Sequence, residues 1–300
     1  MNSAERIHQV LFVVAVTLAL VLASVGMKFS EEIIVVLLVI SVAVFGLPHG
    51  ALDPLVARKA MIWKRPRGLA IFICIYLLIA TVTFVIWLAF PKTALICFLA
   101  YSAWHFGGDW SKYFAGHWRL WPGLFIVSAP VALHPKETTE IFEILANEPI
   151  AEWWTEISNL FAAFSVLGVL GALRIFSIDQ NMGMVLELLV IAVSALVLPP
   201  LAFFILYFCG LHSVRHLLET TSGYQPSELL RYGCVFTLLT IALSGLAYQF
   251  KPTESVEASL LQITFIGLAV LTVPHMILTE YIKSSIAIRN PSTQSCIYFG

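Results

Sequence analysis

The sequence is poor in charged residues. Asp, Glu, Lys and Arg make up 12% of the 300 residues, whereas about 25% is typical of a soluble globular domain. The 17 Lys and Arg nearly balance the 18 Asp and Glu, so the chain lacks the basic excess of a nucleic-acid-binding protein. Hydrophobic residues make up 59% of the chain, and the mean hydropathy is +0.89. These figures exclude a soluble globular protein and a disordered chain, and they indicate an integral membrane protein.

Several sequence motifs that carry chemistry are also absent. The five cysteines are scattered and form no CxxC pair, so neither a disulfide framework nor a zinc ribbon is predicted. The chain has no G-x-S-x-G, no H-E-x-x-H and no glycine loop of the kind that holds phosphates. Hydrolysis of a polar substrate is therefore poorly supported.

The apolar segments are long enough to cross a bilayer as helices. A hydrocarbon core of about 30 Å needs about 20 apolar residues in a helix, and the alternating pattern of a transmembrane barrel is absent. We predict an all-α, polytopic integral membrane bundle, a single domain over residues 1–300, with about ten (eight to ten) transmembrane helices. The candidate spans are 9–26, 32–48, 68–90, 93–107, 120–134, 157–178, 183–198, 200–218, 229–248 and 257–278. Pro199 and Pro200 form either a turn between two spans or a kink within one.

The basic residues predict the orientation of the chain. With the N-terminus in the cytoplasm, only Lys28, Lys92, Lys136 and Lys251 fall outside, and the other Lys and Arg residues fall on the cytoplasmic side. The first span follows Arg6 and lacks a clean cleavage site, so we expect an uncleaved first helix. We expect a multi-pass protein that is embedded in the lipid bilayer of the cell (inner or plasma) membrane.

Five of the eight histidines lie at the ends of predicted spans. His49 ends the second span, His105 the fourth, His212 and His216 the eighth, and His275 the tenth. All of these spans are even-numbered, so a topology that depends on Lys and Arg alone brings all five histidines toward the cytoplasmic side. Ionisable residues within membrane spans are costly and are functional candidates by default.

The spacing of two histidines predicts a metal site. His212 and His216 are four residues apart, so both imidazoles project from one helix face and can reach a single ion. Neutral imidazole suits iron, copper, zinc and nickel, and helical bundles build metal sites from side chains on facing helices.

Two carboxylates repeat this spacing. Asp53 follows His49 by four residues, and Asp109 follows His105 by four. A metal-binding histidine usually passes its second N–H to a carboxylate or a carbonyl. The two aspartates are therefore either residues that orient the histidines or solvated carboxylates at helix ends, and both interpretations stay open.

Aromatic residues surround the same segments. Trp104, Phe106, Tyr207 and Phe208 are candidates for the walls of an apolar substrate cavity, although such a stripe is also typical of core packing. A redox-active metal at the inner edge of an apolar cavity favours oxygen chemistry on a lipid-soluble molecule.

The histidine segments resemble a known family. PHGALD, WHFGGD, HSVRH and the late PH, in this order, resemble the Brp/Blh family of β-carotene 15,15′-dioxygenases over about residues 45–280. The resemblance implies a membrane-bound enzyme that uses Fe(II) and O2 to cleave the central double bond of β-carotene into two all-trans-retinal molecules. It implies that His49, His105, His212 and His216 bind the iron, and it places His275 in the last motif as an additional residue. It further implies that retinal passes to a rhodopsin-type apoprotein in a bacterial or archaeal cell membrane.

Other function classes are weighed against this one. A desaturase or another histidine-iron lipid oxygenase typically carries about eight histidines in several HxxxH or HxxHH boxes, whereas this chain has one HxxxH. A metal or proton transporter predicts polar residues at intervals across the bilayer and often an inverted repeat. Haem bound by paired histidines would give a Soret band.

Overall fold

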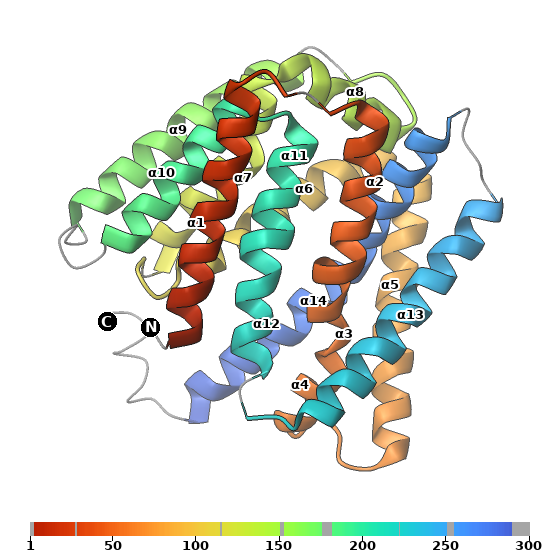
Figure 1. Cartoon of the computed structure of the whole chain (residues 1–300). Coiled ribbons are helices and arrows are strands. Elements are labelled where there is room, and N and C mark those ends of the chain that lie inside the picture. Colours follow the sequence, from red (N-terminus) through yellow and green to blue (C-terminus); the bar gives the residue numbers. More distant parts are fainter. Residues whose placement is uncertain are drawn as a thin grey trace.

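The structure is a computed structural model that describes residues 3–27, 29–114, 116–150, 153–175, 182–221, 223–250 and 255–289. Within these ranges every regular element is a helix and no strand occurs. The helices pack side by side, with α5 and α13 at one side of the molecule, α9 and α10 at the other, and α14 crossing obliquely between the two sides (Figure 1). The predicted all-α class is confirmed.

The N-terminal half of the chain forms seven α-helices in the described ranges. These are α1 (Ser3–Ser24), α2 (Glu31–Ser41), α3 (Leu47–Ala51), α4 (Asp53–Lys59), α5 (Pro66–Ala89), α6 (Pro91–Gly107) and α7 (Leu120–Leu133). A π-helical turn, η1 (Val42–Gly46), joins α2 to α3. Two 3-10 turns, η2 (Gly108–Trp110) and η3 (Gly116–Arg119), lie between α6 and α7.

The C-terminal half also forms seven α-helices in the described ranges. These are α8 (Pro135–Ala146), α9 (Trp153–Ile175), α10 (Met182–Val197), α11 (Pro200–Phe204), α12 (Ser213–Thr221), α13 (Pro226–Phe250) and α14 (Val256–Arg289). A second π-helical turn, η5 (Ile205–His212), joins α11 to α12. Helix α8 lies across the end of the bundle opposite the N-terminus and α12 (Figure 1).

In the described residues, each of the predicted spans coincides with a helix or with a continuous helical stretch, and residues 176–178 of the predicted span 157–178 lie outside the described ranges. Five stretches are long and apolar enough to cross a membrane: Ser3–Ser24, Pro66–Ala89, Pro200–Thr221, Pro226–Leu246 and Val256–Lys283. Most of their apolar side chains face outward. In α5, for example, 6% of the residues in its most apolar 18-residue stretch are buried. Because soluble proteins rarely expose large continuous apolar patches, these helices indicate a membrane protein. The number of crossings and the cytoplasmic N-terminus stay predictions.

Pro199 and Pro200 mark a turn between two helices. Helix α10 ends at Val197 and α11 begins at Pro200. The backbone of Pro199 is extended (φ −55°, ψ 150°), because the ring of a proline disfavours the helical conformation of the residue before it. Of the two predicted alternatives, the turn is the one observed.

The two π-helical turns pack against each other in the middle of the molecule. Gly46 in η1 faces Phe208 in η5, and a Cβ at this glycine would lie 2.9 Å from the ring of Phe208. The close approach of the two segments therefore requires glycine at this position. It brings η5, which ends at His212, next to η1, and α12, which follows η5, packs against α3, which contains His49.

Candidate metal centre

Four histidine side chains meet where α6, η5, α12 and α14 converge. The ring centroid of His105 lies 4.7 Å from that of His212 and 5.4 Å from that of His275. The ring of His216 lies 5.0 Å from that of His275 and 6.4 Å from that of His105. The Nε2 atoms of His105 and His212 are 3.1 Å apart. The structure thus brings together histidines that lie up to 170 positions apart in the chain.

The local structure of each segment explains how the rings reach one point. His212 ends η5 and His216 lies in α12, so the pair shares one side of a continuous helical stretch, with 6.3 Å between ring centroids. His105 lies in the last turn of α6, which ends where Gly107 allows the carbonyl of Arg119 to approach. His275 follows Pro274 inside α14, and this helix continues to Arg289 instead of ending at the proline.

His49 is the predicted ligand that the structure tests least. Its backbone belongs to α3, which packs against α12, α13 and α14, the first and last of which carry His216 and His275. The side chain of His49 lies outside the part of the chain that the structure describes. Its role as a ligand stays a prediction.

Asp109 is paired with His212. Nδ1 of His212 lies 3.0 and 3.1 Å from the two carboxylate oxygens of Asp109. Burial raises the pKa of this carboxyl, but the nearby His212 and Arg215 outweigh it, so the pKa lies below its ordinary value. Because an ionised carboxylate only accepts hydrogen bonds, Nδ1 of His212 is the donor. The opposite ring nitrogen, Nε2, faces His105.

Asp53 is paired with His275 in the same way. Nδ1 of His275 lies 2.8 and 3.0 Å from the carboxylate oxygens of Asp53. The side chains of Asp53 and Asp109 are 2% and 7% exposed, so the alternative of solvated carboxylates is excluded. Each aspartate is hydrogen-bonded to a histidine from a distant segment. The reason is that α3 ends before Asp53 and α6 ends before Asp109, so the regular four-residue spacing is interrupted.

The third ring is also held through Nδ1. His216 Nδ1 is hydrogen-bonded to the hydroxyl of Thr220, one turn later in α12, at 3.1 Å. Three of the four described imidazoles are therefore anchored at the same ring atom, which directs the Nε2 edge of each away from its anchor. This arrangement is typical of metal-binding histidines, whose second ring nitrogen is held by an outer hydrogen-bond partner.

The donor set fits a metal that prefers imidazole. Two ligand nitrogens at right angles on one ion, with bonds of about 2.1 Å, lie about 3.0 Å apart, close to the 3.1 Å between Nε2 of His105 and His212. Among the side chains that the structure describes, no three His, Cys, Asp or Glu groups stand at the spacing of a complete metal site. The described atoms thus form a pair of candidate ligands with two more imidazoles beside it.

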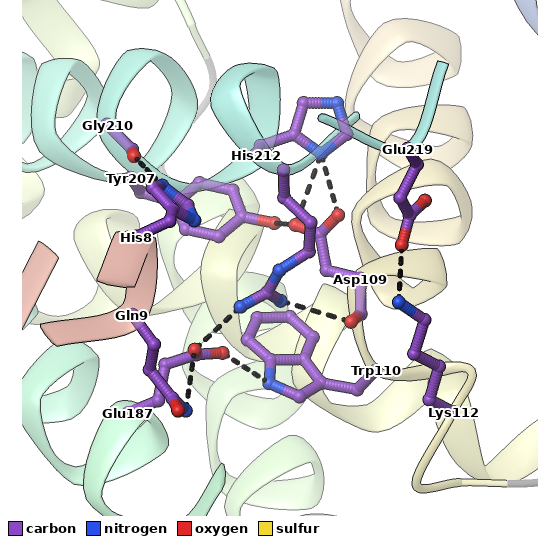
Figure 2. Close-up of polar contacts among 11 residues, drawn as sticks. His8, Gln9, Asp109, Trp110, Lys112, Glu187, Tyr207, Gly210, His212 and Glu219 are labelled. Carbon is purple, nitrogen blue, oxygen red and sulfur yellow. Dashed lines mark hydrogen bonds and ion pairs between the residues drawn. The ribbon is translucent and has the colours of Figure 1, made fainter. Parts of the chain in front are cut away.

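A buried ion pair between Arg215 and Glu187 lies next to Asp109. Figure 2 shows Glu187 and Trp110 beside this aspartate. Nη2 of Arg215 donates to Oε2 of Glu187 at 2.6 Å, and Nη1 donates to the backbone carbonyl of Asp109 at 3.1 Å. Nε1 of Trp110 donates to Oε1 of Glu187 at 3.0 Å. The exposed fractions are 1% for the side chain of Glu187 and 15% for that of Arg215. This pair ties α10 and α12 to η2, so it fixes the backbone that presents Asp109 to His212.

A largely apolar cavity of about 800 Å³ opens beside His275. Helices α5, α13 and α14 form most of its wall, and Asp53, Tyr76 and His275 line one part of it. Gln262 and His275 both line the cavity and lie 13 residues apart on α14, so it extends about 20 Å along this helix. The cavity continues to the end of α8, at Leu145 and Ala146.

The chain is similar to β-carotene 15,15′-dioxygenases. The model of the family described as "Beta-carotene 15,15'-dioxygenase" matches residues 40–283. The chain belongs to this family. It is 34% identical to the "Beta-carotene 15,15'-dioxygenase" of an uncultured marine bacterium, over 83% of this chain and 95% of the relative. It is 27% identical to the "Probable beta-carotene 15,15'-dioxygenase Blh" of Halobacterium salinarum, over 88% of each chain. No solved structure matches.

The predicted cavity residues of this family member have three different locations. Phe208 lines the large cavity. Phe106 and Tyr207 line a separate cavity of about 100 Å³ between α6, α7, α8 and α11. Trp104 was expected in the wall, but it lines neither cavity: it is 38% exposed and stacks against the guanidinium of Arg119, 4.3 Å from the ring centroid. An aromatic residue next to a site histidine in sequence points to another side of the helix.

Sequence reasoning missed three residues of the site. Tyr76 donates a hydrogen bond to Asp53 at 2.9 Å, and nothing in its apolar span marks it. Glu187 and Arg215 carried a usable signal, because a charge in an apolar helix must find a partner. What the sequence does not contain is the pairing of two residues that lie 28 positions apart.

Proposed function

We propose that this chain cleaves β-carotene at its central 15,15′ double bond and releases two molecules of all-trans-retinal. The observation that carries the proposal is the cluster of four histidines, of which His212 and His275 are buried, beside a long apolar cavity. The relatives with which the chain shares its family bear the name of this reaction.

The cavity suits a long, apolar substrate. A molecule without polar groups gains nothing from hydrogen bonds, so burial of its surface must supply the binding energy. The wall that α5, α13 and α14 form along about 20 Å supplies such a surface. Central cleavage requires the middle of the polyene to lie beside the histidines, so one half of β-carotene would occupy this cavity.

The proposed cofactor is Fe(II). His105, His212 and His216 are the ligands that both the family motifs and the observed cluster support. His49 is supported by the motif alone and His275 by its place in the cluster. When bound, ferrous iron supplies the activation of O2, the proposed second substrate.

The residues of the protein orient the histidines and shield the polyene from water. Asp109 and Asp53 fix the rings of His212 and His275 with Nδ1 protonated. Neutral imidazoles leave the charge of the ion uncancelled, and the apolar wall keeps water from the polyene. Addition of O2 across the double bond, followed by fragmentation of the adduct into two aldehydes, requires no acid or base from the protein. This suits a site in which both carboxylates, Asp53 and Asp109, are hydrogen-bonded to histidines.

The membrane supplies the substrate and receives the product. We place the chain in the cell membrane as a multi-pass protein with its N-terminus in the cytoplasm, because the basic residues of the predicted loops lie mainly on that side. Retinal carries one aldehyde on an otherwise apolar polyene, so it would still dissolve in the bilayer and pass through it to a rhodopsin-type apoprotein.

The test is retinal formation in bacteria that accumulate β-carotene. Cells that express this chain should bleach and contain retinal, detected by chromatography. His216→Ala should abolish retinal formation while the protein stays in the membrane at the same level. His117→Ala, which alters an exposed histidine in η3 outside the cluster, should behave like the wild type. Retinal formation by His216→Ala, or unbleached cells with wild-type protein in the membrane, would contradict the proposal.

A further inference from the structure

The two buried aspartates of the site share an arrangement that the sequence does not reveal. Asp109 accepts hydrogen bonds from Nδ1 of His212 and from the hydroxyl of Tyr207, the latter at 2.8 Å. Asp53 accepts from Nδ1 of His275 and from the hydroxyl of Tyr76, at 2.9 Å. The site therefore contains two Tyr–Asp–His chains of hydrogen bonds.

The two hydrogen-bond chains reach the histidine cluster from different parts of the fold. Tyr207, Asp109 and His212 come from η5 and η2, on the side of the buried ion pair (Figure 2). The members of the other chain, Tyr76, Asp53 and His275, come from three separate helices, α5, α4 and α14, and all three line the large cavity. The six residues of the two hydrogen-bond chains come from five separate elements, η2, η5, α4, α5 and α14, and both chains end at the same group of imidazoles.

The tyrosines limit the rotation of the carboxylates. A carboxylate that accepts a hydrogen bond from a single side chain can rotate about its Cβ–Cγ bond. The histidine that is hydrogen-bonded to it can then rotate as well. A second donor on Oδ2 fixes the plane of the carboxylate, and a fixed carboxylate holds the imidazole at one tautomer and one orientation. Both tyrosines are themselves held, since Tyr207 is stacked between Trp110 and Phe203 and the Tyr76 hydroxyl also lies 3.3 Å from the carbonyl of Leu271.

We propose that Tyr76 and Tyr207 are positioning residues of the metal centre, each of which acts through an aspartate on one histidine. The inference rests on the proposed function, because it assumes that the histidines hold iron. Neither tyrosine contacts the metal or the reacting bond. Loss of either hydroxyl should loosen iron binding, because the aspartate would no longer hold its histidine in one orientation.

The test compares three Tyr→Phe variants by their affinity for ferrous iron. Tyr76→Phe and Tyr207→Phe each remove a hydroxyl that contacts an aspartate. Tyr101→Phe is the matched control, because the Tyr101 hydroxyl donates to the backbone carbonyl of Ala269 at 2.8 Å and this residue lies one turn before His105 in α6. All three variants keep the aromatic ring and lose a hydroxyl that donates a hydrogen bond across the fold. A purely structural role would therefore affect the three alike.

The measurement is a titration of the purified, metal-free chain with Fe(II) against a competing chelator. Loss of an outer hydrogen-bond partner typically costs 10–100-fold in metal affinity or activity, so the Kd for iron should rise about tenfold in Tyr76→Phe and in Tyr207→Phe. Tyr101→Phe should stay within about twofold of the wild type, and thermal unfolding of the three variants should differ little.

The outcomes separate this inference from the proposed function. Iron affinities of Tyr76→Phe and Tyr207→Phe equal to that of the wild type, in a wild type that binds iron and forms retinal, would overturn the inference alone. A wild-type chain that binds no iron would overturn both. Equal losses of affinity in all three variants would show that the hydroxyls stabilise the fold and do not position the histidines.

Discussion

Removal of Glu187 should destabilise the protein strongly, because Arg215 would remain buried without its partner. In Glu187→Ala the guanidinium loses its 2.6 Å contact and keeps the one to the carbonyl of Asp109, and Nε1 of Trp110 loses its acceptor. Breaking a buried ion pair from one side costs about 3–5 kcal/mol. At about 2–4 °C per kcal/mol for chains of comparable size, Tm should fall by about 6–20 °C.

The double variant Glu187→Leu/Arg215→Met shows whether the unpaired charge is the cause. Replacing both members of a buried pair by apolar residues of similar size is often close to neutral. Here Trp110 still lacks an acceptor and the Asp109 carbonyl a donor, so a deficit of about 1–3 kcal/mol should remain. The assay is thermal unfolding in detergent, followed by the loss of monodisperse protein. A single variant that melts with the wild type, or a double variant that melts below the single one, would refute this reasoning.

Three further predictions concern the cavity, the π-helical turns and the metal. Ala80→Phe should fill the cavity and lower retinal formation at least tenfold without loss of bound iron, while Leu78→Phe, 63% exposed on the same helix, should leave both unchanged; equal activity of the two variants would show that the cavity does not hold substrate. Gly46→Ala should cost about 1–3 kcal/mol in thermal unfolding by pushing Phe208 away, whereas Gly245→Ala, where a Cβ meets nothing within 4 Å, should not destabilise; similar melting curves would contradict the close packing of η1 and η5. Chelation should abolish retinal formation and Fe(II), but not Zn(II), should restore it; full activity in iron-free protein would exclude an iron centre.

The helices and the histidine cluster could be predicted from sequence because their signals are local. Apolar runs longer than a bilayer core predict helices wherever they occur, and each predicted segment is helical in the structure. The distribution of Lys and Arg along the chain predicts a common depth for His105, His212, His216 and His275, and the cytoplasmic side of the membrane stays a prediction. That four of these rings meet could be inferred from their common depth, although the helices that neighbour one another could not.

The partners within the site depend on contacts between distant segments. Asp53 and Asp109 were matched to histidines by a spacing that holds only in an unbroken helix, and both helices end before the aspartate. The cavity faces of α5 and α13 are as apolar as their lipid faces, so no periodic pattern distinguishes them. Tyr76 shows the consequence, since its place among apolar residues reads as packing until Asp53 is seen beside it.

The most direct test of the account is the number of retinal molecules formed for each β-carotene consumed by the purified, iron-loaded protein. Central cleavage beside the histidine cluster predicts two retinals per β-carotene, about one iron per chain, and no longer apocarotenal. One retinal together with a longer fragment would place a different double bond at the histidines. Unchanged β-carotene in the presence of O2 and iron-loaded protein would contradict the assignment of the cavity to this substrate.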